Sequence, residues 1–430
     1  MPNKTSSARK MITKTGGARQ SNAPLGTAGP AHRRPVWAEV DLSALAKNFH
    51  AIRAYVNPPG EARRDPRKIL SIVKGNGYGH GGPQVAKALE KAGSDWFGVT
   101  CTEEGVAVRA AGVRKPILIL TSFVPGEEQP LVAHELTPVI HRCEQLQALN
   151  HAAARRKSKQ PFAFHLKIDT GMNRLGIAAE DIECFARQLA KCKNLRLGGI
   201  MTHFASSEVF NDTVAGRQTR EQEQRFHDAV ERLRALGVPT GIVHLANSAA
   251  IASRPETWAD MVRPGAILYG YHPGYDPMSR RAEMEARLPL RPVMSLRSRI
   301  ISLRDVPVGV GVGYDAAFET TRPSRIAVLA AGYGDGIHRS LGNHGNVLLR
   351  GKLAPIVGIV SMDVTMLDVT DVPDVAIGDI ATIYGVSSHG VSDEQVLPAS
   401  QVARSIGTVT SDLLCAVSQR VPRIYLHPRT

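Results

Sequence analysis

Residues 69–93 read ILSIVKGNGYGHGGPQVAKALEKAG: an apolar run, a glycine-rich turn and an amphipathic stretch, in that order. The run 69–74 is typical of a buried strand, and 82–93 has the apolar spacing of a helix. A strand followed by a helix is the repeating unit of parallel α/β folds. Lys74 ends the apolar run, so its charged side chain is predicted to leave the strand at the start of the turn.

The same alternation continues to about residue 285. Further strands are predicted at 96–100, 116–120, 137–140, 162–169, 197–203 and 242–246, and helices at 43–56, 102–112, 178–193 and 217–237. Seven or eight repeats of roughly 25–35 residues favour a closed barrel over an open doubly wound sheet. The predicted fold class is therefore α/β, with a (β/α)8 TIM-type barrel over residues 35–285.

The pattern changes over residues 286–430. Stretches such as RPVMSLRSRIISL (291–303) and APIVGIVSMDVTMLDV (354–369) contain short strands, Gly and Pro but almost no helical spacing. They predict a C-terminal, mostly-β domain, with one helix at 397–412 packed on it. The stretch WAEVDL (37–42) fits either domain.

Charge and composition limit the function. The chain has 430 residues and a net charge of +14, and residues 1–35 hold seven Lys or Arg and no acidic residue. Residues 1–34 are predicted to be a disordered basic tail. The tail lacks the apolar segment of a secretory signal, although its composition is also compatible with a transit peptide.

Several classes of partner are not expected. No apolar run is long enough to span a membrane, and no basic–aromatic stripe suggests nucleic-acid binding. The five cysteines form no CxxC pair, which favours a reduced, cytoplasmic setting. No metal site is predicted.

Polar residues follow the predicted barrel strands, where functional side chains of such barrels lie. Besides Lys74, these are Lys167, Asp169, Thr170 and Arg174 in KIDTGMNRLG (167–176), His203 in THFASSE (202–208), Asn247 and Ser248 in HLANSAA (244–250), and Gly265 in MVRPGAILYG (261–270). A lysine at this edge can form a Schiff base with pyridoxal phosphate (PLP). Taken alone, Lys74 could instead be an ordinary lysine that reaches water.

These motifs, together with VGYDAAF, GYGDGIHRSLGN and SMDVTM, resemble those of bacterial alanine racemases. The resemblance covers about residues 35–428 in the family's order and spacing. It implies a homodimeric fold-type III PLP enzyme that interconverts L- and D-alanine and supplies D-alanine for peptidoglycan. It also implies a barrel followed by a β domain, as predicted above.

The resemblance also implies a role for each matching residue. Lys74 would hold PLP and act as one catalytic base, and Tyr314 of the partner subunit would be the other. The cofactor phosphate would be bound by Tyr78, Ser248, Gly265 and Ala266, with Asn247 beside them, and Arg263 would face the pyridine nitrogen. His203 would lie between Arg263 and Tyr314. Arg174 and Met362 would bind the substrate carboxylate, Lys167 would be carbamylated, and Tyr333 and Asp363 would line the entrance.

Two bases suit this chemistry, because racemisation removes a proton from one face of the α-carbon and returns one to the other. A tyrosine with an ordinary pKa of about 10 is a poor base at neutral pH. Positive charge from Arg263, relayed through His203, would favour its phenolate.

One motif departs from the family. The usual TxxYE stretch reads TVTSDLL (408–414) here and places Ser411 at the tyrosine position. This is either harmless variation or the cause of a roomier pocket that also turns over L-serine.

Three other functions remain open at this stage. A fold-type III decarboxylase would carry HxGS, where this chain has HLANS, and a late CxxD, where Cys415 lies in LLCAVS. A racemase of broad specificity would tend to lack Lys167. A single-barrel PLP carrier would end near residue 280 and lack Tyr314.

Overall fold

Eight parallel strands form one sheet, in the order β8, β7, β6, β5, β4, β3, β2, β9. The computed structural model describes residues 35–427 apart from 62, 159 and 388–394, so the predicted basic tail lies outside the described residues. The strands are β2 (Lys68–Ile72), β3 (Trp96–Val99), β4 (Ile117–Ile119), β5 (Leu136–Ile140), β6 (Phe162–Lys167), β7 (Leu195–Met201), β8 (Ile242–His244) and β9 (Met261–Val262).

Backbone hydrogen bonds link the two end strands of this sheet. Asp260 N–H donates to Val243 O at 3.0 Å, and Arg263 N–H donates to Ala246 O at 3.0 Å. The sheet is therefore nearly closed, and the predicted TIM-type barrel is confirmed. All seven predicted strands are present, with bounds that differ by at most two residues at either end. The eighth, β9, has only two residues and lies in a stretch that sequence analysis treated as a phosphate loop.

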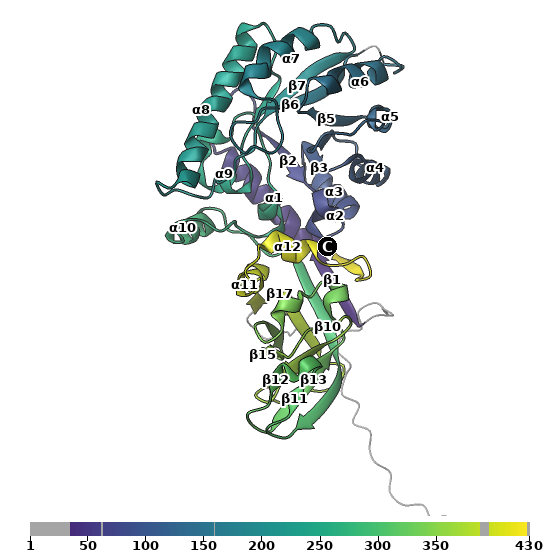
Figure 1. The fold of residues 1–430 in the computed structure, drawn as a ribbon, viewed down its shortest axis with the longest axis vertical. Helices are drawn as coiled ribbons and strands as arrows, with labels where there is room; N and C mark the ends of the chain where they lie inside the picture. Colours follow the sequence, from purple (N-terminus) through teal and green to yellow (C-terminus); the bar gives the residue numbers. More distant parts are fainter. Residues whose placement is uncertain (1–34, 62, 159, 388–394, 428–430) are drawn as a thin grey trace, which may run out of the picture. The chain divides into compact units, whose positions relative to one another are not determined.

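Helices cover the outside of the strands (Figure 1). The predicted ones are α1 (Leu42–Val56), α3 (Gly82–Lys91), α4 (Thr102–Ala110), α7 (Ile182–Leu189) and α8 (Val214–Ala235), and the short helix α9 (Ser248–Ser253) follows β8. The structure adds α5 (Glu128–Ala133), α6 (Glu144–Ala153) and α10 (Ser279–Arg287). Among the described residues, no helix combines the length and apolar character needed to cross a membrane.

Alternation along each strand separates the outer core from the barrel interior. In β6, Phe162, Phe164 and Leu166 pack outward among the buried residues under the helices. His165 and Lys167 therefore point inward, because successive strand residues face opposite sides. The lower interior is filled by Leu70, Ile72, Leu118, Val139, Met201 and Met261. This apolar floor leaves the carboxyl ends of the strands for polar residues.

The C-terminal sheet is organised by the 13-residue strand β10 (Met294–Val306). It pairs with β13 (Ser324–Leu329) and β17 (Ile380–Val386), and the ring runs on through β16 (Thr365–Asp368), β15 (Lys352–Val357) and β14 (Asn346–Leu349). Strands β1 (Val36–Asp41), β19 (Arg423–Leu426) and β18 (Val396–Leu397) extend the sheet, and β11 (Gly311–Val312) and β12 (Phe318–Glu319) form a separate hairpin. The mostly-β domain is confirmed, and the first strand of the chain belongs to its sheet.

Two local predictions are wrong. The strand before Lys74 ends at Ile72, and Lys74 begins the short element α2 (Lys74–Tyr78) instead of ending the strand. The predicted helix 397–412 is divided between β18, α11 (Ala399–Ser405) and α12 (Thr410–Cys415). Gly407, at φ +70°, lies in the break, where a left-handed residue ends the first helix.

A substitution at Gly79 measures how strongly α12 constrains the turn of α2. Its φ is +80°, and a Cβ there would lie 2.1 Å from the carbonyl oxygen of Leu414 in α12. Gly237 has a similar φ of +73° with open space around it. We expect Gly237→Ala to lower the free energy of unfolding by about 1 kcal/mol, and Gly79→Ala by about 2–4 kcal/mol because a steric clash is added. Urea denaturation measures both, and equal losses would show that α12 does not constrain the turn.

Candidate active site

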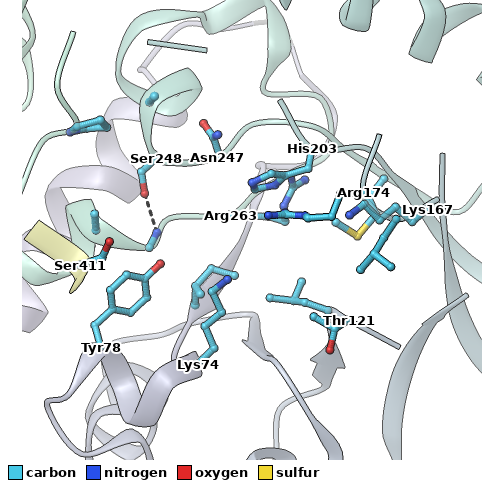
Figure 2. A pocket seen from close by; sticks show the side chains of 18 of the residues that line it. Lys74, Tyr78, Thr121, Lys167, Arg174, His203, Asn247, Ser248, Arg263 and Ser411 are labelled. Atoms are coloured by element: carbon cyan, nitrogen blue, oxygen red, sulfur yellow. Dashed lines mark hydrogen bonds between the residues drawn. The ribbon is translucent and has the colours of Figure 1, made fainter. Parts of the chain in front are cut away.

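A cavity of about 460 Å³ lies at the carboxyl ends of the barrel strands (Figure 2). Ten of the predicted site residues line it: Lys74, Tyr78, Lys167, Arg174, His203, Asn247, Ser248, Arg263, Gly265 and Ala266. Ser411 of α12 also lines it, next to the ring of Tyr78 in Figure 2. Residues that lie up to 192 positions apart in the barrel sequence thus surround one space.

Lys74 enters this cavity from an unusual backbone turn. Gly75, Asn76 and Gly77 have φ/ψ of 62/42°, 53/45° and 64/44°, and Tyr78 and Gly79 follow with φ of 51° and 80°, so five consecutive residues have positive φ. Only glycine, and to a lesser degree asparagine, adopts this region without a large cost. The glycine-rich sequence is therefore explained by the turn, which directs the chain sharply away from β2 after Lys74.

The Lys74 amine is easier to deprotonate than an ordinary lysine. Burial lowers its pKa most, Arg174 lowers it further, and Glu104 and Cys415 act in the opposite direction. A neutral amine is the form that adds to a carbonyl group or accepts a proton. The environment of Lys74 thus favours a nucleophile and base.

One wall of the cavity gathers hydrogen-bond donors. Asn247 caps α9 by accepting from Ala250 N–H at 3.0 Å, and this fixes the start of the helix at Ser248. Ser248 Oγ accepts from Gly265 N–H at 2.8 Å, drawn as the dashed line in Figure 2. Burial raises the pKa of Tyr78 to about 12, so its phenol stays protonated and can donate. Two hydroxyls beside a close backbone can bind an anion.

Gly265 is required for this arrangement. A Cβ at this position would lie 2.6 Å from the hydroxyl oxygen of Tyr78. Any side chain would therefore displace the tyrosine or fill the space between the hydroxyls.

Arg263 is buried on the opposite wall. Its two amino groups donate to the carbonyl oxygens of His244 at 2.8 Å, Thr202 at 2.8 Å and Leu245 at 2.7 Å. They also contact Nδ1 of His244 at 3.3 Å and Nδ1 of His203 at 3.4 Å. Within the part of the chain that the structure describes, Arg263 has no carboxylate partner. Burial lowers its pKa to about 9, which still leaves it charged at neutral pH.

A second arginine and a lysine lie along the same side. Asp169 accepts from the backbone N–H groups of residues 171–174 and so holds the loop that carries Arg174. Burial, with Arg174 and Arg263, lowers the pKa of Lys167 to about 8. Asp169 therefore shapes the loop, whereas Lys167 and Arg174 face the cavity.

Comparisons with known proteins match this arrangement. The model of the alanine racemase N-terminal domain matches residues 40–273, and that of the C-terminal domain matches residues 293–425. The chain is 38% identical to alanine racemase of Halothermothrix orenii over 392 residues, 91% of this chain and 97% of the relative. It is 39% identical to that of Desulfovibrio desulfuricans over 393 residues, 91% of this chain and 98% of the relative.

The chain belongs to the alanine racemase family.

Solved structures of alanine racemases agree in fold. The one from Streptomyces lavendulae has a TM-score of 0.81 at 29% identity, covering 93% of this chain and 98% of that one. The one from Bacillus anthracis with bound L-Ala-P has a TM-score of 0.79 at 30% identity, covering 92% and 96%. With the C-terminal domain matched as well, the chain is a racemase with both domains and not a single-barrel carrier.

Alanine racemases are PLP enzymes, and the cavity of this racemase fits that cofactor. Gly265 leaves space between two hydroxyls for a phosphate, and the Lys74 amine opens into the same cavity. Among the described residues, Nε of Arg263 has no hydrogen-bond partner, whereas both amino groups do. It is the N–H of this guanidinium left to donate to a ring nitrogen.

Four predicted residues of this racemase lie outside the cavity, all in the β domain. Tyr314 begins the short turn η4 (Tyr314–Ala316) between β11 and β12 and is 66% exposed, and Met362 and Tyr333 are 53% and 45% exposed. Tyr333 N–H donates to Ser361 O at 2.9 Å, so the segments around Tyr333, Met362 and Asp363 are adjacent. The chain thus does not place Tyr314, Tyr333, Met362 or Asp363 among the residues that line its own cavity.

Sequence analysis missed several groups. His165 and His244 lie below Arg263 inside the barrel, with His165 Nδ1 2.9 Å from His244 Nε2. Alternation in FAFHLK could have placed His165 on the inner face with Lys167, two residues later. Glu208 and Thr121, which line the cavity, and Glu104, which contacts the turn after Lys74, gave no such pattern.

Proposed function

We propose that this chain interconverts L-alanine and D-alanine with PLP as cofactor, using Lys74 and Tyr314 as two bases. The observation that carries the proposal is the single cavity in which the Lys74 amine, the Arg263 guanidinium and a two-hydroxyl cradle meet. In the cell it would supply D-alanine for peptidoglycan, and the cytoplasm is the proposed location.

The barrel residues would bind and orient the cofactor. Tyr78, Ser248 and the backbone of Gly265 and Ala266 would hold the phosphate, with Asn247 fixing Ser248. Arg263 would donate a hydrogen bond from Nε–H to the pyridine nitrogen. The proton would stay on the arginine, because guanidinium is a poor acid. When bound, PLP supplies an electron sink that acidifies the α C–H of the substrate.

Lys74 and Tyr314 would exchange the α-proton on opposite faces. The Lys74 amine nitrogen accepts a proton from one face, and the Tyr314 phenol oxygen of the partner subunit returns one to the other. Transfer of one proton from Lys74 to solvent and of one from solvent to Tyr314 then restores both groups, so that turnover in the same direction can continue.

His203 would connect the Arg263 guanidinium to the phenol oxygen of Tyr314 from the partner subunit. Arg263 can only donate, so Nδ1 of His203 accepts and the ring proton lies on Nε2. Burial and the charge of Arg263 hold the pKa of His203 well below its usual value, so the ring is neutral. We infer that Nε2–H donates to the phenolate oxygen of Tyr314, which stabilises the basic form of that residue.

Arg174 would bind the substrate carboxylate, with the backbone N–H of Met362 from the partner subunit, and Tyr333 and Asp363 would line the entrance. These roles need a homodimer, and the exposure of Tyr314, Met362 and Tyr333 in the single chain supports one. We also propose that the barrel spans 35–285 and the β domain 286–430, except that β1 (Val36–Asp41) joins the sheet of the β domain.

Replacing the two bases separates their roles. Lys74→Ala should abolish both racemisation and covalent retention of PLP after borohydride reduction. Tyr314→Phe should retain PLP, lose racemisation by at least about 10²-fold, and still exchange the α-proton of one enantiomer in D₂O. Chiral chromatography, intact mass and ¹H NMR measure these. Exchange of both enantiomers by Tyr314→Phe would contradict the two-base assignment.

Carbamylation of Lys167 should follow its pKa. The amine reacts with CO₂ only when neutral, forming an N–C bond and releasing a proton. At fixed dissolved CO₂ we therefore expect the carbamate signal to grow as pH rises through about 8, the lowered pKa of this amine. ¹³C NMR with labelled CO₂ measures it, with Lys167→Arg as the control. A signal unchanged by Lys167→Arg would place the carbamate elsewhere.

Ser411 should widen the substrate range. Its short side chain lines the cavity next to Tyr78, where a larger ring would take up space. We expect measurable turnover of L-serine, and a fall of roughly tenfold in the ratio of kcat/KM for L-serine to that for L-alanine in Ser411→Tyr. Chiral analysis of both products gives the ratio, and an unchanged ratio would refute a role for this position.

A further inference from the structure

Glu104 joins two elements at the mouth of the barrel. Its Oε1 accepts from the backbone N–H of Gly75 at 2.7 Å and of Asn76 at 3.2 Å. Its Oε2 accepts from the backbone N–H of Thr100, just after β3, at 2.8 Å. One carboxylate thus ties the turn that follows Lys74 to the next strand of the barrel.

The left-handed turn needs partners at its beginning. Its first internal hydrogen bond runs from Gly77 N–H to Val73 O at 2.7 Å, which leaves the N–H groups of Gly75 and Asn76 without partners inside the turn. Gly75 and Asn76 are exposed, so water is also available to these N–H groups, but an ionised carboxylate is a stronger acceptor and holds a fixed position. Glu104 supplies that acceptor at the end of the turn next to Lys74.

The far end of the turn is held by other contacts. Asn76 Oδ1 accepts from Gly82 N–H at 2.8 Å, and Gly79 lies against the backbone of Leu414. Neither contact reaches the peptide that joins Lys74 to Gly75. Without Glu104, this peptide could rotate, and the direction of the Lys74 side chain would no longer be fixed.

Helix capping explains only half of these contacts. Glu104 is the third residue of α4, and an acidic side chain there commonly accepts from backbone N–H groups at the helix start. That accounts for the bond from Thr100, but not for the two bonds from the turn. Glu103, the preceding residue in the same helical turn, is exposed and makes no bond to the turn after Lys74, so it provides a matched control.

We propose that Glu104 is a positioning residue for Lys74, whose carboxylate fixes the left-handed turn and so aims the Lys74 amine into the cavity. The inference rests on the proposed role of Lys74 in holding PLP.

The charge of Glu104 acts on the same amine. The charged or titratable groups that face Lys74 are Arg174 and Lys167 from the β6 side, His203 after β7, Glu104 on α4 and Cys415 on α12. Arg174 lowers the pKa of Lys74, and Glu104 raises it. Removing the negative charge should therefore lower this pKa and shift the neutral amine to lower pH.

The test compares Glu104→Ala, Glu104→Gln and Glu103→Gln in the full-length protein stripped of cofactor. The rate of PLP capture is followed across pH by the visible absorption of lysine-bound PLP, and the thermal midpoint is measured in parallel. We expect Glu104→Ala to slow capture roughly tenfold or more, because the turn loses its charge-assisted bonds. Glu104→Gln keeps an acceptor, so its loss should be smaller and its capture profile should move to lower pH, while Glu103→Gln matches the wild type.

Three results would overturn the proposal. Wild-type capture rates and pH profile in Glu104→Ala would do so, and so would a lower thermal midpoint with unchanged capture, which would assign Glu104 to capping alone. If Glu104→Ala does not fold, an unchanged rate and profile in Glu104→Gln would be decisive. Covalent PLP retention by Lys74→Ala after borohydride reduction would instead refute the proposed function, independently of Glu104.

Discussion

A buried cation that has no carboxylate partner among the described residues organises this barrel. The guanidinium of Arg263 is bound by the carbonyl oxygens of residues 202, 244 and 245, which end β7 and β8 or follow them. Removing a charge from water is unfavourable unless dipoles or other charges compensate for it. The carboxyl ends of two parallel strands supply such dipoles. Arg263 directly follows β9, so its hydrogen bonds to these carbonyl oxygens also join β9 to β8. The same interaction therefore supports barrel closure and fixes the charge beside the cavity.

The two histidines near this cation are constrained by it. Because Arg263 only donates, Nδ1 of His244 accepts, and its Nε2 must carry the proton that is donated to Nδ1 of His165. Burial lowers the pKa of His165 to about 3 and that of His244 well below its usual value, so both rings are neutral. The interior therefore holds one positive charge at this position instead of three, and the direction of each ring proton is set by the arginine.

Much of this architecture was predictable from periodicity. Strand and helix spacing predicted seven barrel strands and the change to a β domain. Strand-end positions predicted seven of the ten site residues that line the cavity, and the family resemblance added Tyr78, Arg263 and Ala266. Periodicity did not identify elements that are too short to show a repeating pattern of apolar residues. Strand β9 has two residues, and α11 and α12 are separated by a glycine turn within one helical-looking stretch.

Long-range contacts were the other limit on prediction. Glu104 reads as an ordinary residue of an amphipathic helix, and only the fold brings it to the turn at Gly75 and Asn76, 29 and 28 positions earlier. Likewise, nothing in GNGYG indicated that all five of these residues would have positive φ. The glycines signalled a turn, but only the fold shows that it lies against α12, where Gly75 faces Cys415 and Gly79 faces Leu414.

The β domain holds its exposed site residues on a braced surface. Arg420 donates to the fully buried Asp335 at 2.9 Å and pairs with Asp363 at 2.8 Å, and it also donates to Met362 O at 3.2 Å. One guanidinium thus joins the segment that carries Tyr333 to the segment that carries Met362. Ordering such segments on association costs conformational entropy, and prior bracing reduces that cost. If two chains share each site, as proposed, the β domain meets the partner's cavity with this edge already braced, and Tyr314 is presented separately on the turn between β11 and β12.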